Sequence, residues 1–122
     1  MTSPKLPTVY AVQVPMKHGG GRVEPMFDIS PALMYGDIIQ LLPPGPVLLE
    51  TEVSVRTLKS KLAHFDDDDY ILCLGDPVAI AAACMVASQV NGGAVKLLVY
   101  DRQDRRYNAI QIDLFGRMKV PA

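Results

Sequence analysis

Hydrophobic and polar positions change their spacing along the chain, and each change predicts an element. Thr8 to Val14 is rich in β-branched and aromatic residues and predicts a strand that stops at Pro15. The segment 16–25 contains three consecutive glycines and ends in a proline, which favours a mobile surface loop. Order is expected to begin near Thr8, after a flexible arm at residues 1–7.

A short helical turn and two short strands are predicted next. Ser30 is a candidate N-cap, Pro31 occupies the first helical position, and Gly36 supplies a stop. The apolar runs 37–42 and 46–50 are separated by a Pro-Pro-Gly turn, so they predict the two strands of a hairpin.

Apolar residues recur at helical spacing from Thr51 onward. Their positions put one hydrophobic face on the segment, made by Val55, Leu58, Leu62 and Phe65. This pattern predicts an amphipathic helix on the surface of the domain. Four consecutive carboxylates, Asp66 to Asp69, come next, and they repel one another and oppose the helix dipole. The helix is therefore expected to end before them.

The second half of the chain predicts a strand–helix–strand unit followed by a hairpin. Residues 70–74 form a continuous apolar run, as in strands covered on both faces. Residues 78–90 carry no charge and many small side chains, which predicts a helix buried nearly all round. Segments 94–101 and 106–114 predict two antiparallel strands joined by the turn 102–105.

The order of these elements predicts a mixed α/β fold. A helix between two strands implies that the strands are parallel, whereas the terminal hairpin adds antiparallel pairing. We therefore expect a single α/β domain at 8–115, with two main helices, a mixed sheet of about five or six strands and a tail at 116–122.

Composition adds limits on location and chemistry. The 122 residues include 12 Lys and Arg against 13 Asp and Glu, and this balance argues against a protein that coats nucleic acid through bulk charge. No apolar run reaches the about 20 residues of a membrane span, and no signal-peptide pattern opens the chain, so a cytoplasmic location is expected. Cys73 and Cys84 lie in apolar stretches and are predicted to be reduced core residues.

Gly75, Asp76 and Pro77 lie where a predicted buried strand meets a predicted buried helix. Asp76 can accept a hydrogen bond from a first-turn amide, and Pro77 has no amide to lose, which predicts a helix cap. Ligands also bind at such positions in α/β sheets, so a nucleotide or phosphate site is the alternative, with Asp76 as a polar contact or metal ligand. The missing glycines of a dinucleotide or P-loop motif favour the cap.

The acidic run Asp66, Asp67, Asp68 and Asp69 has three interpretations. Carboxylates suit Mg²⁺ and Ca²⁺, but the run lacks the alternate spacing and the turn glycine of a calcium loop. A solvated linker is therefore favoured over a metal site. The third interpretation is a phosphate mimic that meets a basic partner.

Basic and aromatic residues gather on the predicted C-terminal hairpin. They are Lys96, Tyr100, Arg102, Arg105, Arg106 and Tyr107. Such a surface can contact phosphates and stack on the bases of single-stranded nucleic acid. Asp101 and Asp104 can pair with the same arginines, so a self-paired, solvated hairpin is favoured.

Groups suited to nucleophilic catalysis are sparse. His18 and His64 are the two histidines, and neither has the spacing to a cysteine that a zinc site requires. The apolar surroundings of the two cysteines also disfavour a Cys/His pair. No catalytic residue and no cofactor are predicted.

The block Asp66 to Ile80, followed by Asn91-Gly-Gly and Val95 to Arg102, resembles small proteins of tailed phages and viral metagenomes that have no assigned activity. The resemblance extends to Asp28-Ile-Ser-Pro and Leu42-Pro-Pro-Gly in front of it. It implies a phage-encoded protein and carries over no catalytic residue.

These observations lead to a non-enzymatic phage protein, accessory or host-modulating, that acts on a macromolecule in the host cytoplasm. A protein partner is expected, and an uncharged helix together with open sheet edges also favours a homodimer. The alternatives are a nucleotide- or phosphate-binding domain at Gly75 to Pro77, including a small hydrolase, and a single-stranded nucleic-acid binder through the Arg102 to Tyr107 hairpin.

Overall fold

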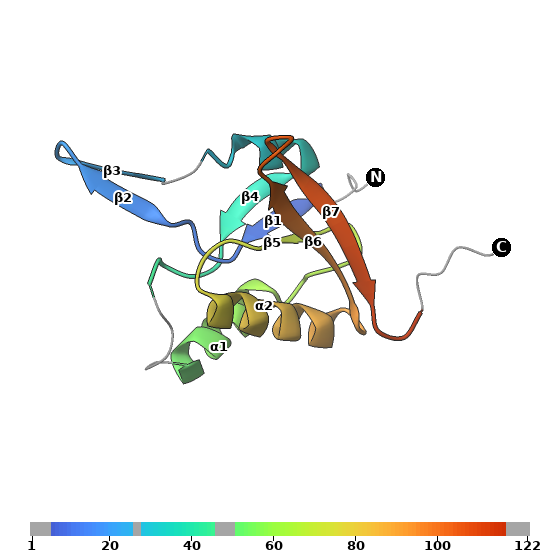
Figure 1. The fold of residues 1–122 in the computed structure, drawn as a ribbon. Helices are drawn as coiled ribbons and strands as arrows, with labels where there is room; N and C mark the ends of the chain where they lie inside the picture. Colours follow the sequence, from blue (N-terminus) through green and yellow to red (C-terminus); the bar gives the residue numbers. More distant parts are fainter. Residues whose placement is uncertain (1–5, 26–27, 46–50, 117–122) are drawn as a thin grey trace, which may run out of the picture.

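The computed structural model describes residues 6–25, 28–45 and 51–116, and its fold is built on a five-stranded mixed sheet (Figure 1). In spatial order the strands are β4 (Asp37–Gln40), β1 (Thr8–Ala11), β5 (Tyr70–Leu72), β6 (Ala94–Asp101) and β7 (Arg106–Asp113). All neighbouring pairs are parallel except β6 and β7, which form the antiparallel C-terminal hairpin. The predicted mixed α/β fold is confirmed.

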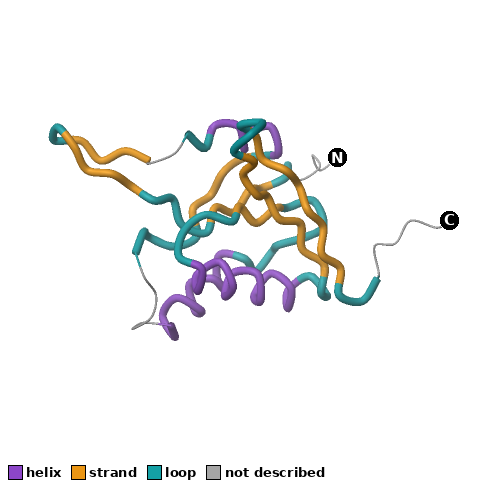
Figure 2. The backbone as a smooth tube through the Cα atoms, viewed as in Figure 1, coloured by secondary structure: helices purple, strands orange, loops and turns teal. Residues whose placement is uncertain are grey.

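Two α-helices cover one side of this sheet, and a short 3-10 helix lies on the other (Figures 1 and 2). The helices α1 (Thr51–Lys61) and α2 (Pro77–Val90) contact each other, and α2 also contacts β6. The 3-10 helix η1 (Ser30–Tyr35) contacts β1, β4 and β7. No helix in the described ranges combines the length and hydrophobicity needed to cross a membrane.

β1 separates two hydrophobic clusters because its side chains alternate between the two faces of the sheet. Tyr10 packs in the cluster on the α-helical side, which includes Leu58 and Leu62. Val9 packs in the cluster on the side of η1, together with Ala32. The sheet is thus buried on both faces near its centre, as the apolar run of β5 predicts.

Residues 16–25 form a hairpin and not the predicted loop. β2 (Met16–Gly19) pairs antiparallel with β3 (Arg22–Pro25) in a separate two-stranded sheet. Gly20 and Gly21 have φ angles of 57° and 78°, which are the left-handed values that a tight hairpin turn requires. In the sequence these glycines argue against regular structure. In the fold they form the tight turn that allows β2 and β3 to pair.

The start of η1 also differs from the prediction. Ile29 is the N-cap in place of Ser30, whose backbone N–H donates to Asp28 Oδ1 at 3.0 Å. Gly36 ends the helix as predicted. The predicted strand at 46–50 and most of the N-terminal arm lie outside the described residues, and β4 pairs in parallel with β1.

The charge-free sequence predicts that α2 is buried nearly all round, and this prediction is wrong. Its buried side chains are Ala79, Ala83, Val86 and Ala87. Met85 is 73% exposed, and Val78 and Val90 are also exposed. One side of an uncharged helix therefore faces solvent.

Candidate functional site

The parallel strands β1 and β5 are neighbours, so their carboxyl ends lie side by side. The next strand of this sheet after β1 is β4, on one side of the pair, and the next after β5 is β6, on the other side. The buried side chain of Gln13 fills this point. Its Oε1 accepts a hydrogen bond from the backbone N–H of Asp76 at 2.7 Å. Its Nε2 donates to the carbonyl oxygens of Pro43 at 2.8 Å and Gly45 at 2.6 Å. One polar side chain thus joins the loops that follow three strands.

Asp76 caps α2, as its position predicts. Its Oδ1 accepts a hydrogen bond from the backbone N–H of Val78 at 3.3 Å, and Pro77 occupies the first turn. Gly75 has a φ of 114°, and a Cβ at this position would lie 2.6 Å from Gln13 Cβ. A cavity of about 290 Å³ adjoins this loop.

Few first-turn amides of α2 are left to bind an anion. The N–H groups of Asp76 and Val78 already donate within the chain, and Pro77 has none. The geometry therefore supports a capping role, and the nucleotide or phosphate site at Gly75 to Pro77 stays a prediction.

Asp69 is fully buried, so the predicted solvated linker is wrong at this residue. Its Oδ1 accepts a hydrogen bond from the backbone N–H of Thr8 at 2.9 Å, and its Oδ2 accepts one from that of Asp66 at 3.0 Å. Because Thr8 begins β1 and Asp69 immediately precedes β5, this carboxylate ties two adjacent strands together at one end.

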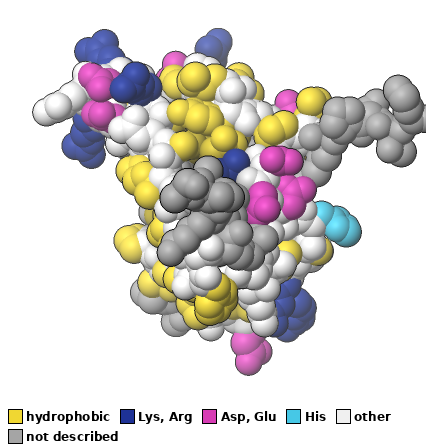
Figure 3. Space-filling view, turned by 90° about the vertical axis from the view of Figure 1, so that its right-hand side faces the viewer, with side chains coloured by type: hydrophobic (Ala, Val, Ile, Leu, Met, Phe, Trp, Pro, Cys, Tyr) yellow, Lys and Arg dark blue, Asp and Glu magenta, His cyan; other side chains and the backbone are white. Residues whose placement is uncertain are grey.

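The rest of the acidic run is organised by local hydrogen bonds. Asp66 Oδ1 accepts from the backbone N–H of Asp68 at 2.9 Å, and Asp67 Oδ1 accepts from Asn91 Nδ2 at 2.8 Å. Acidic side chains gather on one face of the molecule in Figure 3. Within the described ranges no three His, Cys, Asp or Glu side chains are arranged to hold a metal ion. The metal site at Asp66 to Asp69 stays a prediction.

The aromatic and basic residues of the C-terminal hairpin do not form one open surface. Tyr107 is buried, its ring centroid lies 5.2 Å from that of Tyr100, and its carbonyl oxygen accepts a hydrogen bond from the Tyr35 hydroxyl at 2.8 Å. Burial raises the pKa of Tyr107. Lys96 Nζ lies 4.3 Å from the ring centroid of Tyr70. Tyr100 is thus the exposed aromatic residue of the predicted nucleic-acid surface.

The tip of this hairpin is partly self-paired, as predicted. Arg106 Nη2 lies 3.6 Å from Asp104 Oδ2, while Arg102 and Arg105 are exposed. The backbone N–H groups of Asp104 and Gln103 donate to Asp101 Oδ1 and hold the pKa of this carboxyl below its usual value. Asp101 therefore organises the turn, and nucleic-acid binding at the hairpin stays a prediction.

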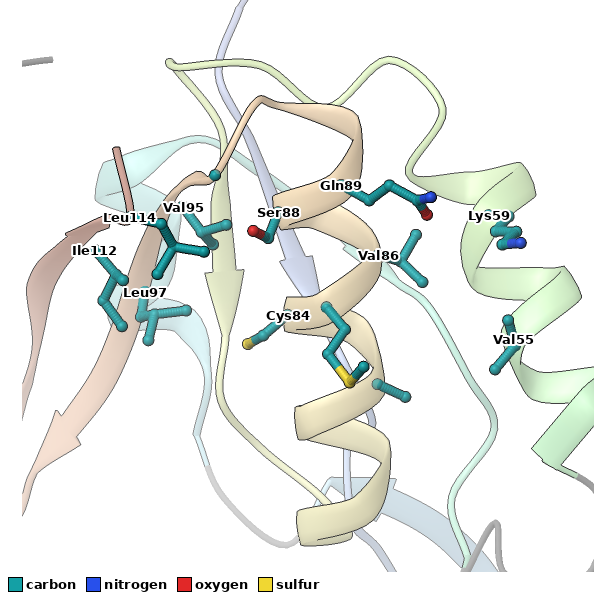
Figure 4. Close-up of a pocket in the computed structure, with 13 residues that line it drawn as sticks. Val55, Lys59, Cys84, Val86, Ser88, Gln89, Val95, Leu97, Ile112 and Leu114 are labelled. Carbon is teal, nitrogen blue, oxygen red and sulfur yellow. The ribbon is translucent and has the colours of Figure 1, made fainter. Parts of the chain in front are cut away.

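An apolar hollow of about 730 Å³ runs along α2. Figure 4 shows Val55 and Lys59 of α1 on one side of α2 and the strands β6 and β7 on the other. We call this surface the α2 face and define it by the lining residues Val55, Lys59, Ala82, Cys84, Met85, Val86, Ser88, Gln89, Gly93, Val95, Leu97, Ile112 and Leu114.

Strand register explains why this face is apolar. Val95 pairs with Ile112, and Leu97 pairs with Ile110, so these side chains share the face of the sheet that carries α2. β7 lies at the edge of the sheet, and Ile110, Ile112 and Leu114 are 46%, 45% and 64% exposed.

Sequence reasoning missed the α2 face. Its signal in the sequence was the charge-free helix α2 together with isoleucine at the alternate positions 110 and 112 of β7. The charge-free sequence of α2 predicted a helix buried nearly all round, and only the arrangement of the elements in space shows how much of α2 and β7 is exposed.

The family model described as Phage Pam3 gp32-like protein matches residues 7–114. The chain belongs to this family. The resemblance to small phage proteins is thereby confirmed, and the matched residues include all five strands of the main sheet and both α-helices. Comparisons with curated proteins and with solved structures give no match.

Proposed function

We propose that this member of the phage Pam3 gp32-like family is a non-enzymatic binding protein that holds a protein partner on the α2 face. The observation that carries the proposal is the solvent-open apolar hollow of about 730 Å³ along α2. Contiguous exposed apolar surface is costly for a single chain and commonly marks a protein–protein contact. Such a role suits an accessory or host-modulating factor that acts in the cytoplasm of an infected cell.

The chemistry around the hollow favours an amphipathic helix with acidic residues as the bound segment. Apolar side chains at helical spacing can fill a groove of this kind. Lys59 lines the hollow, and Arg56 is exposed on the same helix, whose one acidic residue is Glu52. Lys61 Nζ instead donates a hydrogen bond to the carbonyl oxygen of Gln40 at 3.2 Å. Carboxylates at the border of the partner's apolar stripe would therefore meet a basic α1.

A peptide library that displays segments of the phage's and the host's proteins tests this function. It is selected with the wild type, with Met85→Asp on the α2 face and with Met34→Asp as the matched control. Met85 and Met34 are 73% and 78% exposed, and Met34 belongs to η1 on the opposite side of the sheet. We expect enriched peptides with apolar residues three or four positions apart and neighbouring carboxylates.

The two variants should differ clearly in their affinity for the enriched peptides. Met34→Asp should bind the enriched peptides as the wild type does, whereas Met85→Asp should bind them at least about tenfold more weakly, which is about 1.4 kcal/mol. Peptides that bind all three proteins equally, or a selection that enriches no peptide, would contradict the proposed function.

A second copy of the chain is the alternative partner. β7 is eight residues long and has one neighbour in the sheet, so it offers an open edge beside the same apolar face. Sedimentation equilibrium distinguishes the two partners. A dimer that Met85→Asp dissociates, and Met34→Asp does not, would assign the α2 face to self-association.

A further inference from the structure

β7 is an edge strand of the main sheet, and its sequence lacks the usual protection of an edge. Among the described strands its one neighbour is β6, and Figure 1 shows it at the border of the sheet. Natural proteins commonly protect such an edge with charged side chains, a proline or a very short strand. β7 has eight residues, and its charged residues, Arg106 and Asp113, lie at its two ends. A further strand can therefore pair along the uncharged stretch between them.

The register of the C-terminal hairpin shows which backbone groups of β7 face this edge. The N–H of Leu114 donates to the carbonyl oxygen of Gly93 at 3.0 Å, and these two residues continue the ladder of β6 and β7. Hydrogen-bonded and non-hydrogen-bonded pairs alternate along an antiparallel ladder. The backbone groups of Ile110 and Ile112 therefore point towards β6, whereas those of Ala109, and of alternate residues on either side of it, point away from β6.

The Tyr35 hydroxyl closes one end of this edge. It donates a hydrogen bond to the carbonyl oxygen of Tyr107 at 2.8 Å. A further strand would therefore pair with the stretch that runs from residue 109 to residue 113. On the side of the sheet that carries α2, this stretch presents Ile110 and Ile112, which are 46% and 45% exposed.

We propose that a second copy of the chain pairs antiparallel with β7, so that the two five-stranded sheets join into one. A twofold axis relates the two copies, so the same strand is used by both. Residues whose backbone groups point outwards face one another in such a pair. Ala109 of each copy would therefore lie opposite Asp113 of the other, with Gln111 on the twofold axis.

This register is self-complementary. It places Ile110 of each copy opposite Ile112 of the other, and apolar pairs directly across two strands stabilise a sheet. Arg106 of each copy would face Gly116 of the other, so no like charges are opposed. A second copy therefore fits this edge both in its apolar pattern and in its charges.

The joined sheet would carry the helices of both copies on the same face. The twofold axis of two antiparallel edge strands is perpendicular to the sheet, so neither copy is turned over. Because β7 makes the contact, α2 stays open to the proposed protein partner. The inference is thus separate from the proposed function, and either can fail without the other.

Sedimentation equilibrium of the wild type, Ala109→Pro and the matched control Ala109→Val tests the proposal. The wild type should be a dimer. Proline removes an N–H that points away from β6, so the ladder of the hairpin stays intact while the dimer loses a hydrogen bond from each copy. We expect Ala109→Pro to raise the dissociation constant of the dimer at least about tenfold. Ala109→Val keeps the N–H and should leave this constant within about threefold.

Two double variants test the register without a proline. Ile110→Lys combined with Ile112→Lys puts like charges opposite each other and should dissociate the dimer. Ile110→Lys combined with Ile112→Glu puts opposite charges in the same cross-strand pairs. This variant should associate at least about tenfold more tightly than the double-lysine variant.

Thermal unfolding confirms that each variant is folded before its association is compared, and the double variants decide the outcome if Ala109→Pro does not fold. Met85→Asp should remain a dimer even where it loses the peptides selected on the α2 face. A monomeric wild type would overturn the proposal. A dimer that Ala109→Pro leaves intact, that Met85→Asp dissociates, or in which the two double variants associate equally would also overturn it.

Discussion

Two regions of this molecule invert the usual distribution of polar and apolar groups. Gln13 and Asp69 are polar and at most 2% exposed, whereas Met85 and Leu114 are apolar and 73% and 64% exposed. The buried polar groups bond to the backbone of neighbouring loops and strands. No buried side-chain nitrogen or oxygen in the described part of the chain lacks a hydrogen-bond partner.

The difference separates residues that serve the fold from residues available for function. A buried polar group is stable only where its hydrogen bonds are satisfied, so removing it should lower the free energy of unfolding. An exposed apolar group contributes little to the fold, so removing it should leave stability unchanged and affect binding. Five predictions, each with its own substitutions, test this separation, from the largest expected effect on stability to the smallest.

Asp69→Ala should have the largest effect. It leaves the backbone N–H groups of Thr8 and Asp66 without their buried acceptor, which should lower the free energy of unfolding by about 3 kcal/mol. Denaturant unfolding measures the change. Asp68→Ala is the matched control in the same acidic run, where the side chain is exposed, and should change stability by less than about 0.5 kcal/mol. If Asp69→Ala also changed stability by less than about 0.5 kcal/mol, the buried carboxylate would contribute nothing to the joining of β1 and β5.

Gly75→Ala should cost about 2 to 3 kcal/mol of unfolding free energy. The backbone φ of 114° disfavours a side chain, and the added Cβ would lie 2.6 Å from Gln13 Cβ. Gly45→Ala separates these causes, because Gly45 has a φ of 120° with no atom within 4 Å of the added Cβ. If both substitutions cost the same in denaturant unfolding, the close approach of Gln13 contributes nothing.

Asp76→Ala should cost about 1 kcal/mol through loss of the α2 cap, and Asp76→Asn only a few tenths of that. Thermal unfolding with nucleotides, phosphate, Mg²⁺ and Ca²⁺ adds a test of the alternative site. A ligand that raises the melting temperature of the wild type, and not of Asp76→Asn, would establish Gly75 to Pro77 as a binding loop.

Asp101 should give the hairpin a small dependence on pH. Its folded-state pKa lies below the ordinary aspartate value of 3.8 because backbone N–H groups of Asp104 and Gln103 donate to it. Its contribution to stability is therefore present above the ordinary value and is lost as the pH falls through the lowered folded value. The difference in melting temperature between wild type and Asp101→Asn should be constant above about pH 5 and shrink towards about pH 2. A difference that does not change with pH would contradict this role.

Met85→Asp should change the unfolding free energy by less than about 0.5 kcal/mol, because the side chain is mostly exposed. Denaturant unfolding alongside Met34→Asp checks this value. If Met85→Asp unfolds as readily as Asp69→Ala, the α2 face belongs to the core and the contrast between the two regions disappears.

Local patterns predicted most elements correctly. The helical spacing of Leu58 and Leu62 identified α1, and Asp76 and Pro77 marked the start of α2. The β6 and β7 strands also have almost the predicted limits. These features depend on neighbours a few positions apart, and a sequence pattern records such neighbours directly.

The predictions were wrong where one local sequence is compatible with two structures. Consecutive glycines indicate a loop, or they make the tight turn of a hairpin, as Gly20 and Gly21 do. An acidic run indicates a solvated linker, but one carboxylate within it, Asp69, is an internal acceptor. In both cases the residues nearby in the chain do not decide between the two structures.

The sequence by itself determined the α/β class, the strand–helix–strand unit, the capped start of α2 and the family. The tertiary structure decided which residues meet. It paired Gln13 with the loops after β4 and β5, and it left the apolar residues of α2 and β7 exposed together. The physical reason is that periodicity shows which side of an element is apolar, while the packing of distant elements determines whether that side is covered.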